Sequence, residues 1–426
     1  MTAAAAPAPE RQEEIDRRLA RYNVTRHARD FWPDVPLRTF RAAQEELGRV
    51  AAAVLTGATT PAELRWPAGA ARALGVTAFA GGVGALLGYW CETGRVTAEP
   101  DVAALFATHL QHGRRRAGRL RQELERVVMA LAERGIHVWV LKGMHTGYRY
   151  FPEPGARLCS DIDLLVRPED WQSARAALSV LGLVETRDPS HPRVSAWAPR
   201  EPQQVPTLAY AHADAPWSID MHWSLDRLPF EGLETGLGTP EPSAGEVWNE
   251  FCRPVQILAQ PLLFTYLALH ASSHFYAMMQ LRLIELVLVA RRDFAGRPGR
   301  WDEFRELVAR TGSGRFVFPA LDLAARLVPG SVDERVLGAI TAAAPRRLRR
   351  LVRRMAPATA QRLHPFPVLM ERFVWLASRR DLLAALVWLL WPRDDARAAR
   401  PMKALVIQWR RVRSAVRRVV QARLRR

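Results

Sequence analysis

The segment LCSDIDLLVRPEDW, residues 158–171, places two acids one residue apart at the start of an apolar run. Aspartate is a poor strand former, yet Asp161 and Asp163 alternate with Ile162 directly ahead of the apolar residues 164–166. On a strand, positions i and i+2 point to the same face, separated by about 6.5–7 Å. The pattern therefore predicts a buried strand at 161–166 with two carboxylates on one face. Such a pair is typical either of a solvated turn or of a metal site.

A third acid stands in a second predicted strand, SIDMHW at 218–223, where Asp220 lies between Ile219 and Met221. If the two strands are neighbours, about 4.7–4.9 Å apart, Asp220 completes a cluster of three carboxylates. Unpaired carboxylates that face one another raise each other's pKa, and a divalent cation removes that repulsion. Magnesium prefers carboxylate oxygens, waters and substrate phosphates, so the cluster indicates a metal site.

The spacing of apolar residues before, within and after these strands indicates a small mixed α/β core at 118–230. An amphipathic helix precedes the core strands, and a glycine ends it. The predicted elements are a helix at 118–135, strands at 136–141 and 161–166, a short helix at 144–151, a turn at 152–155, a helix at 168–182, and a hairpin of strands at 207–212 and 218–223.

Basic residues near the acids suit a phosphate. Lys142 and Gly143 form a predicted strand-to-helix turn, where free backbone N–H groups favour an anion. Gly143 allows close approach of the backbone, and Lys142 supplies a point charge. Arg157, four residues before Asp161, could neutralise a phosphate oxygen or brace the carboxylates. We place Ser160 with Lys142, Gly143 and Arg157 as nucleotide- or phosphate-binding candidates.

Each of these signals is weak when taken alone. An acid pair at 161–163 is common in solvated turns, a strand-Lys-Gly-helix turn is common in many folds, and Asp220 could be an ordinary exposed strand residue. Their order along the chain and their placement on neighbouring elements favour one site. A divalent metal, a phosphate cradle and a third acid are the groups that phosphoryl or nucleotidyl transfer requires.

Composition sets broad limits on the protein. The chain has 426 residues, 49% of them hydrophobic and 24% charged, which is typical of a globular protein. A net charge of +18 favours an anionic partner such as a nucleotide, a nucleic acid or a membrane surface. The excess lies mainly at 346–426. Lys142 and Lys403 are the only lysines, so arginine is the default base of this chain.

The cysteines and the apolar stretches indicate a cytoplasmic protein. Cys91, Cys159 and Cys252 are widely separated and lack CxxC spacing, which fits a reducing compartment and argues against a disulfide framework or a zinc site. The N-terminus lacks the apolar core of a secretory signal. The apolar stretches at 76–90 and 382–391 are too short to span a bilayer, so we expect buried helices there.

The fold class expected from these patterns is α+β, with a small mixed-sheet core embedded between mainly helical N- and C-terminal regions. A glycine- and proline-rich linker at 231–246 precedes a long apolar helical stretch at 261–292. The expected regions are a flexible tail at 1–10, a helical region at 11–117, the α/β core at 118–230, a helical domain at 231–344 and a basic helical region at 345–426.

The stretch VLKGMHTGYRYFPEPGARLCSDIDLLVRPEDWQSARAALSVLGL resembles the uncharacterised nucleotidyltransferase family, within the polymerase-β-like nucleotidyltransferase superfamily. The shared motifs are a leucine-lysine-glycine turn, a tyrosine-proline stretch, an arginine four residues before the acid pair, and DIDLLV. The D-x-H-W strand with Asp220, His222 and Trp223, and a helix with the spaced histidines His270 and His274, extend the resemblance to about 125–330.

This resemblance implies a nucleotidyltransferase fold, a small mixed sheet flanked by helices. It also implies that Asp161, Asp163 and Asp220 are catalytic and bind two magnesium ions. One departure concerns the phosphate cradle. The superfamily's Gly-Ser before the acid pair is here Lys142-Gly143, and Gly143 stands eighteen residues ahead of Asp161. That departure leaves nucleotidyl and phosphoryl transfer both open.

We therefore expect a Mg²⁺-dependent nucleotidyltransferase, with Mn²⁺ as an alternative ion. It would move a nucleoside monophosphate from a nucleoside triphosphate such as ATP to an acceptor hydroxyl or phosphate. The acceptor could be a small molecule, a peptide, a sugar, an RNA or a protein. The alternatives are a kinase-like phosphotransferase with the same site, or a non-catalytic basic protein that binds nucleic acid or membrane.

Other candidates are weaker. His270 and His274 share a helical face and could bind a metal with Glu285 or His222, but packed histidines are the more common outcome. His222 could act as an acid or base or support the orientation of Asp220. Trp223 could stack on a nucleobase, although a core aromatic is the more common outcome. Cys159 receives no role.

The C-terminal segment 402–424 carries an apolar stripe flanked by arginines, and 345–355 repeats this composition. Such a helix binds an anionic membrane or a nucleic acid, or packs on its own domain. The first of these outcomes would place the protein peripherally at a membrane.

Overall fold

The computed structural model describes residues 17–18, 32, 34–67, 69–186, 194–200, 217–226, 233, 235–249, 254–274, 278–359 and 374–390. Three predictions fall outside these residues: the tail at 1–10, the strand at 207–212 and the apolar stripe at 402–424.

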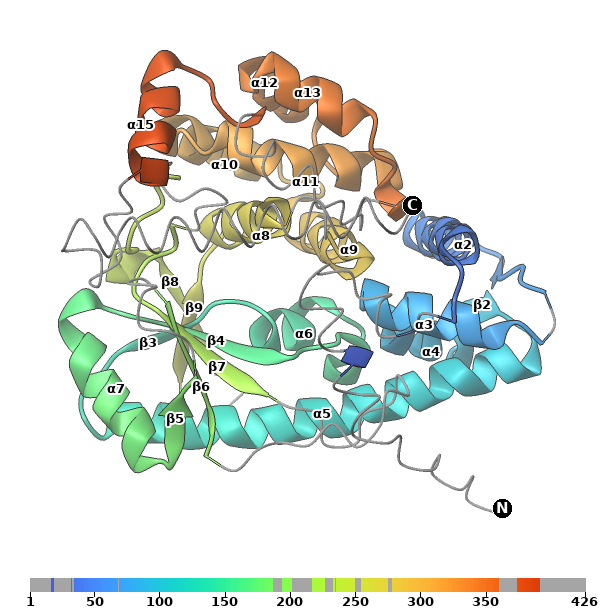
Figure 1. The fold of residues 1–426 in the computed structure, drawn as a ribbon, viewed down its shortest axis with the longest axis horizontal. Helices are drawn as coiled ribbons and strands as arrows, with labels where there is room; N and C mark the ends of the chain where they lie inside the picture. The colour runs from blue at the N-terminus through green and yellow to red at the C-terminus, as the bar shows by residue number, and fades with distance from the viewer. Residues whose placement is uncertain are drawn as a thin grey trace.

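A mixed sheet of seven strands forms the centre of the fold (Figure 1). Its strand order is β5-β6-β7-β4-β3-β9-β8. Strand β4 pairs in parallel with β7 on one side and antiparallel with β3 on the other. The strands are β3 (Val138–Val140), β4 (Asp161–Val166), β5 (Leu183–Glu185), β6 (Val194–Pro199), β7 (Ser218–His222), β8 (Gly245–Trp248) and β9 (Val255–Leu258).

Alternation along β4 gives the sheet two different faces. Ile162, Leu164 and Val166 pack in one apolar cluster with the helices α5 (Pro100–Ala132) and α7 (Trp171–Val180). Leu165 belongs to a second cluster on the opposite face, with α8 (Leu262–Ser273) and α9 (Gln280–Val289). Asp163 shares its parity with Leu165, so it faces the α8 side of the sheet.

Helix α5 connects the N-terminal helices to the sheet. It begins with Pro100 in its first turn, a position where the missing N–H of proline is harmless. Its first half packs in the cluster of α3 (Ala71–Gly81) and α4 (Gly84–Glu92), and its second half lies under the sheet (Figure 1). The predicted helix at 118–135 is therefore the second half of a longer helix.

The flanking helices share one core with the α8 face of the sheet. Helix α2 (Leu37–Leu55) contributes to the same cluster as α8, α9 and α11 (Gly314–Leu327). Gln280 links α2 to the segment that follows α13 (Arg346–Arg353), because its amide donates to the carbonyls of Gln44 at 2.8 Å and Ala358 at 3.1 Å. The remaining elements are β1 (Ala62–Glu63), β2 (Val96–Thr97), α6 (Met144–Tyr150), α10 (Pro298–Thr311), α12 (Glu334–Ala343) and α15 (Arg379–Leu390).

The structure confirms the α+β class and corrects several local predictions. The antiparallel neighbour of β7 is β6, which we did not predict; its Pro199 lies at the strand end, where a ladder tolerates proline. The predicted linker at 231–246 runs into β8, and β9 follows, so the sheet continues past residue 230. The apolar stretch at 261–292 is two helices, α8 and α9, rather than one.

The two apolar stretches at 76–90 and 382–391 have different outcomes. The first is buried as predicted, but as two helices, α3 and α4, that meet at 116°. The second forms most of α15, and over 382–387, where the structure describes the side chains, the prediction that it is buried was wrong. Its apolar side chains stay between 39% and 63% exposed, at Leu382, Leu383, Leu386 and Val387. No single helix among the described residues is long and apolar enough to cross a membrane; α3 and α4 meet that test only together.

A close backbone contact holds the loop that leads into β4 against α5. A Cβ on Gly113 would lie 2.1 Å from the carbonyl oxygen of Gly155, and one on Gly155 would lie 2.8 Å from the backbone of Arg114. Side chains at these two positions would separate the helix from the turn at Pro154–Ala156. The close contact between Gly113 and Gly155 therefore fixes the position of the turn from which the chain continues to Asp161.

Gly113→Ala should destabilise the protein by about 1–3 kcal/mol, because the new methyl group overlaps backbone that has no room to move. The matched control is Gly118→Ala in the same helix, where nothing lies within 4 Å of the added Cβ. That change should stabilise by about 0.5–1 kcal/mol through helix propensity alone. Urea unfolding of both variants measures the difference, and equal effects would contradict the contact.

Candidate metal and phosphate site

The parallel register of β4 and β7 brings two of the predicted acids together. Asp163 is the direct partner of Asp220, and Leu165 is the partner of His222. Asp163, Asp220 and His222 each offer one ligand atom, and these atoms lie within 4.8 Å of one another. They form the one group of three or more potential metal ligands in the described part of the chain. Asp161 lies outside this group, opposite Ser218.

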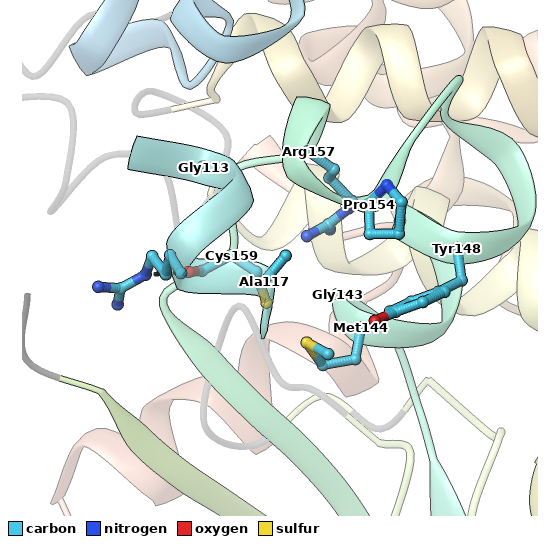
Figure 2. A pocket seen from close by; sticks show the side chains of 10 residues that line it. Gly113, Ala117, Gly143, Met144, Tyr148, Pro154, Arg157 and Cys159 are labelled. Carbon is cyan, nitrogen blue, oxygen red and sulfur yellow. Dashed lines mark hydrogen bonds between the residues drawn. The ribbon is translucent and has the colours of Figure 1, made fainter. Parts of the chain in front are cut away.

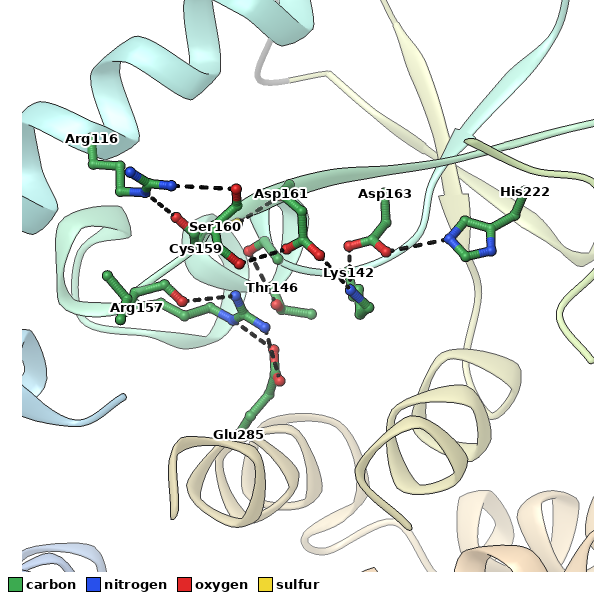
Figure 3. A network of polar contacts seen from close by, with 12 residues as sticks. Arg116, Lys142, Thr146, Arg157, Cys159, Ser160, Asp161, Asp163, His222 and Glu285 are labelled. Atoms are coloured by element: carbon green, nitrogen blue, oxygen red, sulfur yellow. Dashed lines mark hydrogen bonds and ion pairs between the residues drawn. The ribbon is translucent and has the colours of Figure 1, made fainter. Parts of the chain in front are cut away.

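Lys142 lies on the other side of the Asp163 carboxylate. Its ammonium forms an ion pair with Asp163 Oδ2, and Asp161 Oδ2 is 3.9 Å from the same nitrogen (Figure 3). His222 Nε2 lies 3.4 Å from the second oxygen, Asp163 Oδ1. The exposed fractions of the side chains are 0% for Asp163, 5% for Lys142 and 32% for Asp161. Asp163 is thus fixed from both sides, whereas Asp161 is accessible.

Gly143 makes the turn that follows Lys142. Its φ of +70° favours glycine, and an added Cβ would lie 2.9 Å from Cys159 Sγ. The Cys159 thiol donates to the carbonyl of Asp161 at 3.0 Å. Burial raises the pKa of this thiol to about 11, so Cys159 is a neutral packing group at neutral pH. This agrees with the absence of a predicted role for it.

Arg157 is held by a partner distant in sequence. Its Nε and Nη2 donate to the two oxygens of Glu285 in α9, at 2.8 and 3.1 Å (Figure 3). Burial alone would lower the pKa of this guanidinium, but the Glu285 carboxylate offsets burial and raises the pKa above its usual value. The pair anchors the loop before β4 to α9. Glu285 is therefore engaged with Arg157, and among the described residues it forms no group of potential metal ligands with His270 and His274, which agrees with packing as the more common outcome for these histidines.

The two α8 histidines pack with aromatic rings. The His270 ring stacks on Tyr266 and lies 5.2 Å from the ring of His274. Neither belongs to the group of potential metal ligands.

Arg116 is a site residue that we did not predict. From α5 it donates to the carbonyls of Cys159 at 2.5 Å and Ser160 at 3.3 Å. Burial lowers its pKa below the usual value for arginine. The sequence did carry a signal, because Arg116 occupies the apolar stripe of α5, four residues before Leu120. The Ser160 hydroxyl lies 3.3 Å from Asp161 Oδ1, at the exposed end of β4.

A small pocket adjoins this cluster, between α5, α6 and the turn at Pro154–Ala156 (Figure 2). Its wall combines the glycine turn with two guanidinium-bearing residues and the Cys159 thiol. The lining residues are Gly113, Arg116, Ala117, Gly143, Met144, Gly147, Tyr148, Pro154, Arg157 and Cys159. Basic side chains and closely approachable backbone therefore lie next to the acids, as a phosphate-bearing ligand requires.

A mixed sheet that carries an acid pair on one strand and a third acid in register on its parallel neighbour is the arrangement expected of a nucleotidyltransferase core. The chain belongs to the uncharacterised nucleotidyltransferase family, which it matches over residues 71–329. The match begins before the motifs recognised at 125–330, and it includes α3, α4 and α5. Neither a curated protein nor a solved structure matches the chain.

His145, on α6, is a second residue that the sequence did not single out. The ring is fully buried, neither nitrogen has a hydrogen-bond partner among the residues that the structure describes, and the ring meets those of Tyr150 and Trp248 edge-on. Burial, with help from nearby Arg149, lowers the pKa of His145 to about 3. The imidazole is therefore neutral in the folded protein at neutral pH.

The low pKa of His145 predicts acid destabilisation. An unfolded histidine takes up a proton near pH 6.5, whereas the folded one takes it up only near pH 3. The unfolded state thus binds more protons between these limits, and stability should fall by up to about 1.4 kcal/mol per pH unit as the pH drops through them. His145→Leu should remove this component and be near neutral at pH 7, since no hydrogen bond is lost.

Urea unfolding at pH 7, 5.5 and 4.5 measures the difference between the wild type and His145→Leu. His137→Leu, at an exposed histidine, is the matched control for the loss of a histidine. Equal acid slopes in the wild type and His145→Leu would show that His145 becomes protonated in the folded state.

Proposed function

We propose that this protein is a divalent-metal-dependent nucleotidyltransferase. It transfers a nucleoside monophosphate from a nucleoside triphosphate to an acceptor hydroxyl or phosphate. The observation that carries the proposal is the in-register pairing of Asp163 with Asp220, beside Lys142, in a chain of this family. Mg²⁺ is the proposed ion and Mn²⁺ the alternative.

The residues present fit such an ion. Asp163, Asp220 and His222 supply two carboxylates and one imidazole within 4.8 Å of one another. Carboxylate oxygens suit Mg²⁺ and Mn²⁺, and an imidazole suits the softer ion better. When bound, the ion would polarise phosphate oxygens and stabilise the charge that develops during transfer.

The side chains around the proposed metal site have different roles in this mechanism. Asp163 is buried and held by Lys142, so it is the fixed ligand. Asp161 and Asp220 are more exposed, and we propose that Asp220 orients the acceptor and receives its proton. Arg116 and the Arg157–Glu285 pair hold the backbone of residues 157–160 still, so that Ser160 and Asp161 face the substrate in one geometry.

The phosphates of the nucleotide would lie beside Gly143. Gly143 has no side chain and lies between Cys159 and Arg157, whose Nη1 is 3.6 Å from the position of a Cβ and donates to the Leu158 carbonyl at 3.5 Å. The Arg157 fork itself is occupied by Glu285, so its main contribution to phosphate binding is positional and electrostatic. Trp223 follows β7 directly and is the candidate for stacking on the base.

The closest alternative is a kinase-like phosphotransferase with the same site. Label transfer separates the two reactions. A nucleotidyltransferase moves α-phosphate label to the acceptor and releases pyrophosphate, whereas a phosphotransferase moves γ-phosphate label and releases the diphosphate. Incubation of the protein with each labelled triphosphate, Mg²⁺ and a host extract also reveals which class of molecule becomes labelled.

Asp220→Asn should abolish function without loss of the fold. The substitution removes one carboxylate at a partly exposed position, and it leaves the Lys142–Asp163 pair intact. Turnover should fall by at least about 100-fold, because charge stabilisation at a metal is worth several kcal/mol. The rise in Tm that Mg²⁺ and triphosphate give the wild type should also be lost. An equal ligand-induced rise in both proteins would contradict the site.

Asp163→Asn provides the contrasting variant. Repulsion among the three acids, as predicted from the sequence, would let this variant keep or improve the metal-free fold. The buried ion pair reverses that expectation, since the amide leaves the Lys142 ammonium without its main partner. A loss of about 3–5 kcal/mol is expected in the metal-free protein.

We further propose an anionic membrane surface as a partner of the outermost helices. Five of the eight residues of α13 are arginine, and within the described part of the chain none of them forms an ion pair. Leu348 and Val352 anchor the helix in the core, and Arg346, Arg347, Arg350 and Arg353 are exposed. Helix α15, which carries exposed apolar side chains, lies in the same outer layer as α13 (Figure 1), and this combination favours a membrane over a nucleic acid.

Arg347→Ala with Arg350→Ala should reduce binding to anionic lipid vesicles several-fold, with a smaller salt dependence than the wild type. Arg305→Ala with Arg310→Ala, at exposed positions of α10, removes the same charge and is the matched control. Sedimentation with anionic and neutral vesicles measures the effect. Equal losses in both pairs would indicate net charge alone, and retained binding to RNA but not vesicles would indicate a nucleic-acid partner.

A further inference from the structure

The Asp163 carboxylate separates two cation positions. Oδ1 faces His222 at 3.4 Å, on the side where Asp220 completes the group of potential ligands. Oδ2 faces the Lys142 ammonium, which also lies 3.9 Å from Asp161 Oδ2. One side of Asp163 thus offers a ligand set, and the other side already holds a positive charge between two carboxylates (Figure 3).

The fold keeps Lys142 in this position. The residue follows β3, and the neighbouring Leu141 N–H donates to the Asp163 carbonyl at 3.0 Å, which fixes the root of the lysine beside β4. The Gly143 turn then leads the chain away from the acids. With only 5% of its side chain exposed, Lys142 has little access to bulk water, and a buried ammonium is stable only beside carboxylates.

Charge balance agrees with this division. Asp161, Asp163 and Asp220 together carry three negative charges when ionised, and Lys142 neutralises one of them. Two negative charges remain, which one divalent ion balances. A second divalent ion between Asp161 and Asp163 would meet the ammonium at contact distance, and like charges this close repel by several kcal/mol in a poorly hydrated site.

We propose that Lys142 takes the place of the second metal ion. The protein itself then holds a single divalent ion, on the side of Asp163 that faces Asp220 and His222. This inference rests on the metal site of the proposed function, and it replaces the two-ion expectation that comes from the family resemblance. The chemical consequence is a site in which one of the two cations beside the triphosphate is part of the chain.

The test counts bound Mn²⁺ without nucleotide, by equilibrium dialysis and electron paramagnetic resonance. The wild type should bind one ion per chain with the spectrum of an isolated ion. Lys142→Met, which keeps the length of the side chain and removes its charge, should bind two, with the broadened spectrum of a coupled pair. Lys403→Met, at the other lysine of the chain, is the matched control and should bind one. Two ions in the wild type, or one in Lys142→Met, would overturn the proposal.

Asp161→Asn keeps the proposal testable if Lys142→Met does not fold. Asp161 lies on the lysine side of Asp163, so its loss should change the Mn²⁺ affinity of the protein by less than about threefold. Asp220→Asn should weaken binding by at least about 100-fold. Equal, large losses in both variants would mean that the ion bridges all three acids, which contradicts the inference. A wild type that binds no Mn²⁺ would instead contradict the metal site of the proposed function, and this inference with it.

Discussion

The buried ion pair between Lys142 and Asp163 is the interaction on which the arrangement of the site depends. Asp163 is fully buried at the centre of the sheet, where an unpaired carboxylate would be strongly unfavourable. The ammonium makes that position tolerable, and the carboxylate in turn makes the buried lysine tolerable. Because β4 is parallel to β7, fixing Asp163 also fixes which residue of β7 stands beside it, and that residue is Asp220. The cluster thus follows from one ion pair and one register.

The helical flanks matter to the site because they hold the chain that enters β4. Residues 157–160 have no regular structure of their own; α5 holds them through Arg116 and α9 through Glu285. The two helices belong to opposite halves of the sequence, on either side of the acid pair. This gives a physical reason for the family match to extend over 71–329, well beyond the strands that carry the acids. A sheet without these helices would keep its acids and lose the geometry of the loop.

The sequence predicted those features that depend on neighbours along the chain. The strand at 161–166 and its alternation are confirmed, as are the short helix after Gly143 and the family. Features set by distant partners were missed. The pairing of Arg157 with Glu285 spans 128 residues, and the outer strands β5, β6, β8 and β9, of which β5 and β8 are the edges, are short segments whose pairing no local period indicates. The exposure of α15 was mispredicted because an apolar composition cannot show whether a helix has a covering surface.

Whether a position of the site carries arginine or lysine indicates what that side chain contacts. Arginine is the default base of this chain, and the two arginines of the site use their planar forks: Arg157 binds both oxygens of one carboxylate, and Arg116 spans two successive carbonyls. Between Asp161 and Asp163 the chain instead carries one of its two lysines. A guanidinium is larger and planar, and it would need more room at this buried position than a compact ammonium does. An ammonium is compact and nearly spherical, and in size and charge it resembles a small hydrated cation more than a guanidinium does. The chain therefore carries a lysine instead of its usual arginine at the position where we propose that a side-chain ammonium replaces a metal ion.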